Sequence, residues 1–198
     1  MTHSINTKEF GLNVIQRHDY DYRNEEIAEY TKRSCKYLKE FITNVSGHEN
    51  YNTFIDVGCG NTVSLDYFKD DYEVNGLDLY PAVEDDRIIV EDFYKLSDVG
   101  KFDIIFCNHT LEHSVGAPLI EQISKAHNIG GALFVAVPDG DYSWAYDITS
   151  STTHWTIYNK GFLRHMFTRY GYECHVEKKC FRGNKGELFL VGVKRFNI

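Results

Sequence analysis

One stretch of the chain, FIDVGCGNT at residues 54–62, limits the possible folds more than any other. Apolar and β-branched residues lead to the acidic Asp56 and then to Gly58 and Gly60, which are separated by one residue. This order is typical of a buried strand that breaks into a ligand-binding turn. The glycines let the backbone approach a ligand closely, and the helix expected next would point its N-terminal amides at that ligand. The stretch therefore predicts a ligand with an anionic or strongly polar part.

The rest of the chain alternates strand and helix patterns. Short apolar runs bounded by turn residues predict strands, and apolar residues at helical spacing predict helices. We expect strands at 53–57, 73–79, 87–90, 102–107 and 132–137, helices at 24–44, 63–68, 117–128 and 159–170, a turn at 130–131, and terminal strands at 172–180 and 187–196. The alternation predicts the α/β class: a Rossmann-like three-layer sandwich with a mostly parallel seven-stranded sheet and a C-terminal antiparallel hairpin.

We expect one domain over residues 1–198, because a chain of this length can bury a core by itself. Residues 1–44 are expected to form an N-terminal arm and a helix, 50–137 the ligand-binding half, and 138–198 a long loop, a helix and the hairpin. An arm of this kind either trails in solvent or folds over a site. The long loop follows Pro138, and loops of such length are often functional.

The charge balance and the cysteines restrict the partners and the compartment. Lys and Arg number 21 against 29 Asp and Glu, which gives a net charge of −8. This excess of negative charge argues against a nucleic acid or an anionic membrane as a partner. The five cysteines form no close pair with metal-ligand spacing, so we expect reduced thiols in a cytoplasmic protein. No apolar run approaches the length of a membrane span, and a small molecule is the partner expected.

Three kinds of site compete for the glycine turn. The dinucleotide fingerprint G-x-G-x-x-G fails because Val63 occupies the third glycine position, and the Gly-Lys-Ser/Thr of a P-loop is absent. A tight turn without a ligand is the third reading. Asp56, however, offers a carboxylate that could take an ammonium group. Asp78 follows about twenty residues later, at the spacing where a carboxylate meets ribose hydroxyls. An amino group and a ribose without a pyrophosphate describe S-adenosylmethionine.

Five segments then occur in the order found in class I S-adenosylmethionine-dependent methyltransferases. They are FIDVGCGNT, GLDLYP, VEDFYKL, FDIIFCNHTLEHS and GGALFVAVPDG. The later HWTIYNKGFLRHMFTRYGYE is similar to the segment before the terminal hairpin of many small-molecule members. The chain resembles this family over about residues 50–196. The resemblance implies binding of S-adenosylmethionine and release of S-adenosylhomocysteine after methyl transfer.

The resemblance also assigns the cofactor site. It implies that the glycine turn lies beneath the methionine part of S-adenosylmethionine. It also implies that Asp56 helps to hold the amino group of that part and that Asp78 binds the ribose. Asp92 would accept from the adenine amino group, although a turn-capping role is an equal alternative on sequence alone. The implied cofactor-binding residues are Asp56, Gly58, Cys59, Gly60, Asn61, Asp78, Leu79, which packs on adenine, Asp92, Phe93, whose backbone lies beside adenine, and Asn108, which faces the methyl-transfer zone.

The acceptor side is predicted from the chemistry of methyl transfer. The reaction is an in-line displacement at a sulfonium, so alignment and desolvation supply much of the rate and no general base is obligatory. A hydroxyl acceptor would benefit from a nearby histidine, and His109 and His154 are the catalytic candidates. A solvated loop position is the alternative for His154. The residues that could contact substrate or close over the cofactor are Tyr20, Tyr22, Trp144 and Trp155.

One rival motif lies within the fourth segment. His109, Glu112 and His113 fit H-x-x-E-H, a pattern of zinc hydrolases whose ligands lie on one helix face. The motif directly follows a buried strand, so no helix is expected there and we predict no metal. The Asn/Asp-Pro-Pro-aromatic signature of amino methylases and the Pro-Cys of cytosine C5 methylases are absent. We expect methylation of a small metabolite or sugar on oxygen or nitrogen. A nucleic-acid or protein methyltransferase and a non-catalytic cofactor-binding protein are the alternatives.

Overall fold

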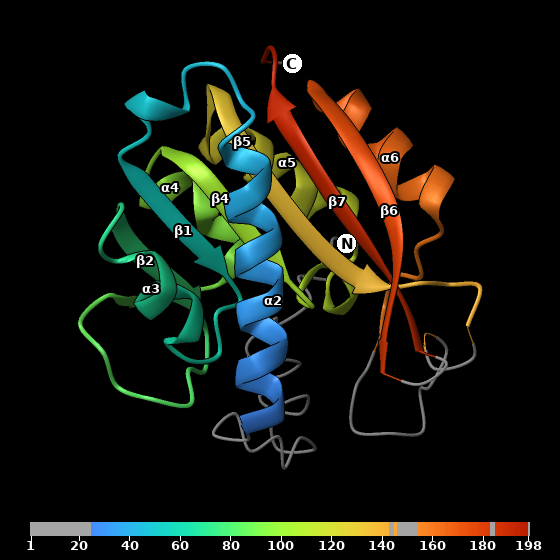
Figure 1. Cartoon of the computed structure of the whole chain (residues 1–198), viewed down its shortest axis with the longest axis horizontal. Helices are drawn as coiled ribbons and strands as arrows, with labels where there is room; N and C mark the ends of the chain where they lie inside the picture. Colours follow the sequence, from blue (N-terminus) through green and yellow to red (C-terminus); the bar gives the residue numbers. More distant parts are fainter. Residues whose placement is uncertain (1–24, 143–144, 146–153, 183–184, 198) are drawn as a thin grey trace, which may run out of the picture.

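Our computed structural model (Figure 1) describes most of the chain. The predicted lid residues Tyr20, Tyr22 and Trp144 lie outside the described residues. The described residues are 25–142, 145, 154–182 and 185–197.

Seven strands form one sheet in the order β3-β2-β1-β4-β5-β7-β6. The strands β1 to β5 pair in parallel, and β7 runs antiparallel between β5 and β6. The predicted α/β sheet with its C-terminal antiparallel hairpin is confirmed. The strand bounds are β1 Thr53–Val57, β2 Glu73–Asp78, β3 Ile88–Val90, β4 Phe102–Asn108, β5 His127–Pro138, β6 Tyr172–Arg182 and β7 Lys185–Lys194.

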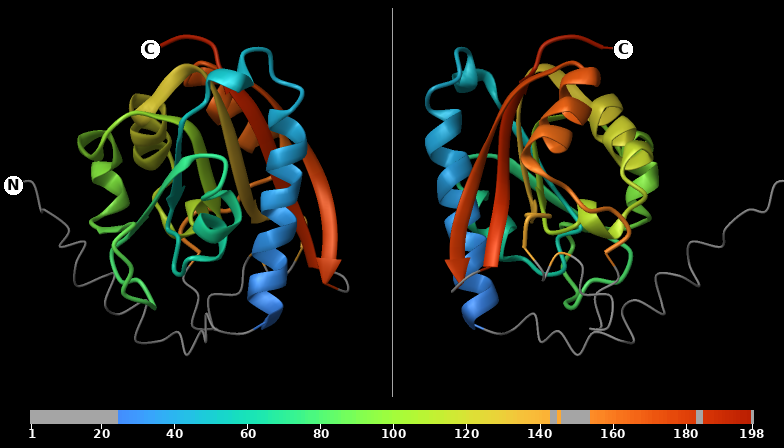
Figure 2. Two further views of the ribbon diagram at one scale, coloured as in Figure 1. Left: turned by 60° about the vertical axis from the view of Figure 1, so that its left-hand side comes forward. Right: turned by 90° about the vertical axis from the view of Figure 1, so that its right-hand side faces the viewer.

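Helices cover both faces of the sheet. Figure 2 shows α2 on one side and α5 and α6 on the other, which is the three-layer arrangement that the sequence predicts. Each face has its own apolar core, one under α2 and α3 and one under α5 and α6. The helices are α2 Glu25–Ile42, α3 Val63–Phe68, α4 Leu96–Val99, α5 Ala117–Ala126 and α6 Lys160–Arg169, and the 3-10 turns are η1 His48–Asn50, η2 Phe93–Lys95 and η3 Leu111–His113.

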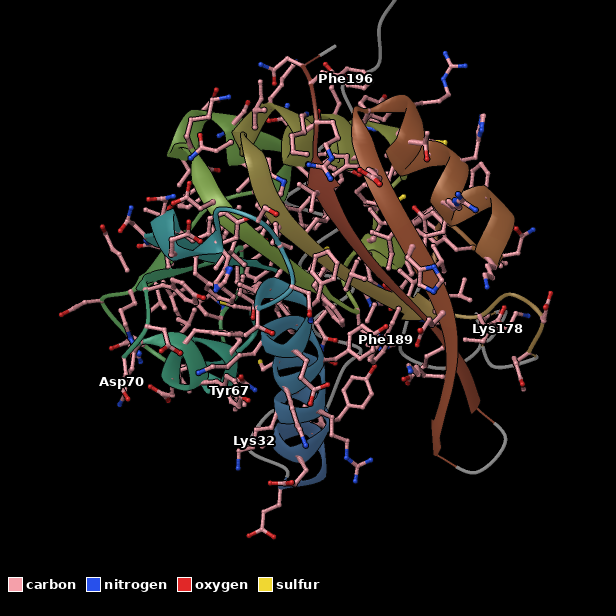
Figure 3. All side chains as sticks on the ribbon, turned by 45° about the horizontal axis from the view of Figure 1, so that its top comes forward. Lys32, Tyr67, Asp70, Lys178, Phe189 and Phe196 are labelled. Atoms are coloured by element: carbon pink, nitrogen blue, oxygen red, sulfur yellow. The ribbon has the colours of Figure 1, made fainter. Side chains whose placement is uncertain are left out.

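The hydrophobic pattern explains why these elements form. In the central strand β4, Ile104 packs in the core under α2 while the next residue, Ile105, packs in the core under α5. A strand buried on both faces must be apolar at nearly every position, as this one is. In α2, Leu38 and Ile42 recur at helical spacing and are buried. Phe189 of β7, labelled in Figure 3, lies under the same helix with its ring centroid 5.4 Å from that of Tyr37.

The prediction for residues 127–131 is wrong. We expected a helix to 128 and a turn at 130–131, but α5 ends at Ala126 and β5 already begins at His127. His127 is buried and lies 2.9 Å from the Tyr172 hydroxyl, which holds it in the sheet. At Gly131 a Cβ would lie 2.5 Å from the Asp103 carbonyl oxygen, so a residue without a side chain is needed there. This close approach occurs where the pairing of β4 with β5 shifts in register, between Phe102 and Ile104. All other predicted bounds lie within two residues of the observed ones.

No helix in the described part of the chain is both long and apolar enough to span a membrane.

Candidate functional site

The candidate site lies at the carboxyl ends of the central parallel strands. Asp56 is in β1, Asp78 ends β2 and Asn108 ends β4. The register pairs Asp56 with Gly76 on one side and with Phe106 on the other. From β1 the next strands along the chain lie toward one edge of the sheet, and from β4 they lie toward the other edge. In open α/β sheets, ligands bind in the crevice at the carboxyl ends of the two strands where the order changes direction in this way.

The glycine turn needs its glycines for packing as well as for a ligand. Gly58 and Gly60 have φ of 76° and 60°, a region that side chains strongly disfavour. A Cβ on Gly58 would lie 2.8 Å from the Cβ of Thr110 and closer still to its hydroxyl and methyl. Gly76 of β2 plays a similar part, because a Cβ there would lie 2.7 Å from the sulfur of Cys59. Sequence reasoning missed both of these contacts.

Asp56 is a buried carboxylate with one satisfied oxygen. It is 3% exposed, and its Oδ2 accepts a hydrogen bond from the Ser64 hydroxyl. Its Oδ1 is buried and has no hydrogen-bond partner among the described residues. Burial raises the pKa of Asp56 to about 7, against a smaller lowering by Ser64. A cationic group at Oδ1 would supply the missing partner and favour the ionised form.

Asp78 closes the turn from the neighbouring strand. Its Oδ2 accepts from the Gly60 N–H at 2.8 Å, and its Oδ1 accepts from the Tyr80 N–H at 2.8 Å. Burial raises its pKa, and the two backbone N–H groups oppose that rise. Because each carboxylate oxygen has about two lone-pair sites, each keeps the capacity to accept from a ribose hydroxyl.

The other predicted cofactor residues have local structural contacts. Asp92 accepts from the Tyr94 N–H at 2.9 Å and caps η2, so the turn-capping alternative is present in the structure. The Phe93 ring packs against Tyr94, with centroids 4.7 Å apart. Asn61 accepts from the N–H of Val63, the first residue of α3, at 3.0 Å. Leu79 directly follows β2 and is partly exposed. Contact of these residues with the cofactor stays a prediction.

His109 follows β4 in an unusual backbone conformation. Its φ is 56°, the only positive value at a non-glycine position in the described ranges, and such strain is often found at functional sites. Its Nδ1 lies 2.9 Å from Glu112 Oε1, and its Nε2 lies 2.6 Å from the Tyr30 hydroxyl. His109 precedes η3 Leu111–His113, so the single helix face of the zinc-hydrolase motif does not form.

Sequence reasoning missed two members of this network. The Tyr30 hydroxyl donates to Glu187 Oε2 at 2.9 Å, so α2 and β7 both reach the end of β4. Burial and the Glu187 carboxylate raise the pKa of Tyr30 well above its usual value. Burial also raises the pKa of Glu112, but His109 and His113 outweigh it and the net shift is downward. In the sequence, Tyr30 has the spacing of an ordinary core position in an amphipathic helix. That spacing gives no sign that its hydroxyl contacts His109 and Glu187.

The segment after the long loop folds back onto η3. The backbone N–H of Trp155 donates to the Glu112 carbonyl at 2.8 Å. His154 Nδ1 lies 3.0 Å from the Ala145 carbonyl oxygen, and its ring centroid lies 5.3 Å from that of His113. The Trp155 side chain is half exposed. The structure therefore brings His154 next to η3, whereas both ring nitrogens of His109 face groups of the protein.

The polar atoms at this edge fit the predicted cofactor. Asp56 Oδ1 and Asn108 Oδ1, at the ends of adjacent strands, are both buried and find no hydrogen-bond partner within the described ranges. The amino group of a methionine moiety supplies several N–H donors for such oxygens. Asp78 lies one strand away with its carboxylate held by backbone N–H groups, where it can accept from ribose hydroxyls.

Comparisons with known proteins agree with this geometry. The profile of the family described as "Methyltransferase domain" matches residues 22–177. No curated protein sequence gives a significant match.

Several solved structures share the fold. A SAM dependent methyltransferase from Archaeoglobus fulgidus has 14% identity and a TM-score of 0.67, covering 89% of this chain and 100% of that one. Haemonchus contortus phosphoethanolamine N-methyltransferase 2, in complex with S-adenosyl-L-methionine, has 14% identity and a TM-score of 0.62, covering 81% and 53%. Human N-acetylserotonin methyltransferase, in complex with SAM, has 14% identity and a TM-score of 0.57, covering 88% and 58%. The chain belongs to the methyltransferase domain family and is an S-adenosylmethionine-dependent methyltransferase.

Proposed function

We propose that this enzyme methylates an oxygen or nitrogen atom of a small metabolite or sugar. The observation that carries this proposal is the acidic character of the edge where an acceptor would enter. Glu112 after β4, Asp139 after β5 and Glu187 of β7 are 2%, 0% and 5% exposed. Pro138 at the end of β5 pairs with Glu187, so these carboxylates belong to the same end of the sheet as the cofactor site.

Buried carboxylates at this edge disfavour a polyanionic substrate. A phosphate backbone would meet like charge at Glu112 and Glu187, and repulsion is strong where water is excluded. Lys178 of β6 is paired with Asp139 at 3.0 Å and is therefore engaged within the protein (Figure 3). A neutral or cationic small molecule suits this environment better than a nucleic acid.

The residues of the chain orient the reactants. Asp56 and Asn108 would hold the amino end of the cofactor and Asp78 its ribose. When bound, the cofactor would supply an electrophilic methyl group to the lone pair of the acceptor, with the electron pair of the broken S–C bond kept by sulfur and the acceptor proton released to water. Alignment of this kind can supply a large part of the rate.

A panel of acceptors tests the proposal. The protein is incubated with S-adenosylmethionine and hydroxy acids, phenols, sugars or amines, and S-adenosylhomocysteine is measured by mass spectrometry. Reactions with RNA, DNA and protein extracts are run beside them. We expect release with at least one small molecule and its loss in Asp78→Ala, which removes the ribose carboxylate. Release only with a nucleic acid or a protein would overturn the substrate class. Tight cofactor binding without release from any acceptor would indicate a non-catalytic binding protein.

A further inference from the structure

Three metal-ligating side chains converge beside the acceptor edge. Glu112, His113 and His154 each offer one ligand atom, and these atoms lie within 4.8 Å of one another. Two of the residues come from η3, and the third comes from the segment that ends the long loop. This segment is held in place by the N–H groups of Trp155 and Thr156, which donate to the Glu112 carbonyl at 2.8 and 3.2 Å.

The carboxylate of Glu112 lacks a partner on one side. Glu112 is 2% exposed, its Oε1 faces His109 Nδ1 at 2.9 Å, and its Oε2 is buried with no hydrogen-bond partner among the residues that the structure describes. A buried carboxylate oxygen left unsatisfied has lost its hydration without gaining a hydrogen bond in return, which is unfavourable. A cation bound at Oε2 would remove this cost, and this observation is independent of the clustering of the three residues.

The surroundings orient the ligands as a metal site requires. The Ala145 carbonyl, 3.0 Å from His154 Nδ1, can only accept, so the neutral imidazole carries its proton on Nδ1 and its lone pair on Nε2. Metal-ligating histidines usually donate their other N–H to a carbonyl or carboxylate in this way. His109 has the corresponding role for Glu112, because it fixes Oε1 and thereby the direction of Oε2.

We propose that Glu112, His113 and His154 bind one divalent transition-metal ion. Two imidazoles and one carboxylate form the donor set of catalytic zinc sites and of other open first-row metal sites. Ligands about 2.1 Å from a tetrahedral ion lie roughly 3.4 Å apart, so the side chains close inward by about 1 Å on binding. The set differs from the H-x-x-E-H motif, since His109 orients Glu112 and is no ligand.

The site would also narrow the acceptor class, a step that rests on the proposed function. Three protein ligands leave at least one position open, beside the end of β4 where the acceptor enters. A metal ion there binds an acceptor hydroxyl oxygen and lowers its pKa, which makes the oxygen a better nucleophile. The acceptor is then a neutral oxygen compound able to coordinate the ion, such as a catechol or a vicinal diol.

Metal binding is tested without any acceptor. The purified chain is stripped with EDTA, dialysed, and titrated by calorimetry with Zn²⁺ and Mn²⁺, and with Co²⁺ followed by visible absorption. We expect one equivalent bound by the wild type and affinity lowered at least about tenfold in Glu112→Gln and in His154→Ala. His175→Ala is the matched control, because His175 lies on β6 with a largely exposed side chain, paired with Glu177, and should bind like the wild type.

The outcomes separate this site from the proposed function. No metal bound by the wild type, or equal affinity in His154→Ala, would overturn the metal site. Retained S-adenosylmethionine affinity in the variants shows that they are folded, so weaker metal binding then reports the lost ligand. Methyl transfer that is unaffected by EDTA would overturn the acceptor role of the ion. Failure to find any acceptor would contradict the proposed function alone, since the titration needs no turnover.

Discussion

Asp56→Asn should stabilise the fold at high pH and weaken the cofactor site. Burial raises the pKa of Asp56 from 3.8 to about 7, so above pH 3.8 the folded chain holds a proton that the unfolded chain releases. The resulting cost of folding grows as pH rises through this window and levels off above pH 7. It amounts to roughly 2 kcal/mol at pH 5 and roughly 4 kcal/mol at pH 8. Asparagine has no such cost, although its N–H₂ would be unpaired at the position of Oδ1.

Urea unfolding of the wild type and the Asn variant at pH 5 and pH 8 measures this effect. The free energy of unfolding of the variant, relative to the wild type, should increase by roughly 2–3 kcal/mol between the two pH values. Using the difference between the two proteins cancels the titration of all other groups. Calorimetry with S-adenosylmethionine should show weaker binding to the variant, and wild-type affinity should rise as pH increases through 7. A variant that loses relative stability from pH 5 to pH 8 would refute the reasoning, because the ionised carboxylate would then be stabilising.

Two further substitutions test the packing of the glycine turn and a buried lysine. Gly58→Ala should lower the free energy of unfolding by roughly 3 kcal/mol through left-handed strain plus the clash with Thr110. Gly47→Ala is the control, because Gly47 has a similar φ of 85° but nothing lies within 4 Å of the added Cβ, so the free energy of unfolding should fall by only about 1 kcal/mol. If denaturant unfolding shows the same loss in both variants, the clash with Thr110 is contradicted. Burial lowers the pKa of Lys194 to about 8, so the wild type should gain about 2 kcal/mol relative to Lys194→Met from pH 7.5 to pH 10. A flat difference over that range would show that the lysine is solvated.

The fold was predictable because each element carries its own periodic signal. The near-continuous apolar run of 102–107 marks a strand with both faces buried, and Leu38 and Ile42 mark the buried face of a helix. The failure at 127–131 has a physical cause. His127 is a polar residue shortly before a glycine pair, which locally resembles a helix end and a turn. Its pairing with Phe102 of β4 and its contacts with Tyr172 and Asp103 hold it in the sheet.

The candidate site was predictable only where its residues lie in one local motif. Asp56 and Asp78 could be found because the strand-turn-helix context fixes where their side chains point. Tyr30 and Glu187 belong to α2 and β7, at opposite ends of the sequence, and no local pattern joins them to His109. The H-x-x-E-H spacing also directed attention to His109 as a metal ligand.

The same limitation applies to His154. It lies in a different segment from η3, and its position depends on how the chain returns from the long loop. The N–H of Trp155 donates to the carbonyl of Glu112, a contact that brings the two segments together. Spacing along the chain gives no indication of this contact, so the sequence did not place His154 beside Glu112 and His113.

The buried polar oxygens at the carboxyl ends of β1 and β4 can be explained by one physical argument. Lys194 is deeply buried, yet its ammonium donates to the carbonyl oxygens of Ser124 and Tyr170, so a buried charged group can be satisfied within the core. Asp56, Asn108 and Glu112 each keep a buried oxygen with no hydrogen-bond partner in the described part of the chain, at the carboxyl ends of β1 and β4 or just beyond. Each such oxygen costs on the order of 1–3 kcal/mol in the free protein. Packing alone would favour apolar residues at these positions, so we infer that a ligand donor or cation offsets the cost, with the amino group of the cofactor at the first two and a metal ion at Glu112.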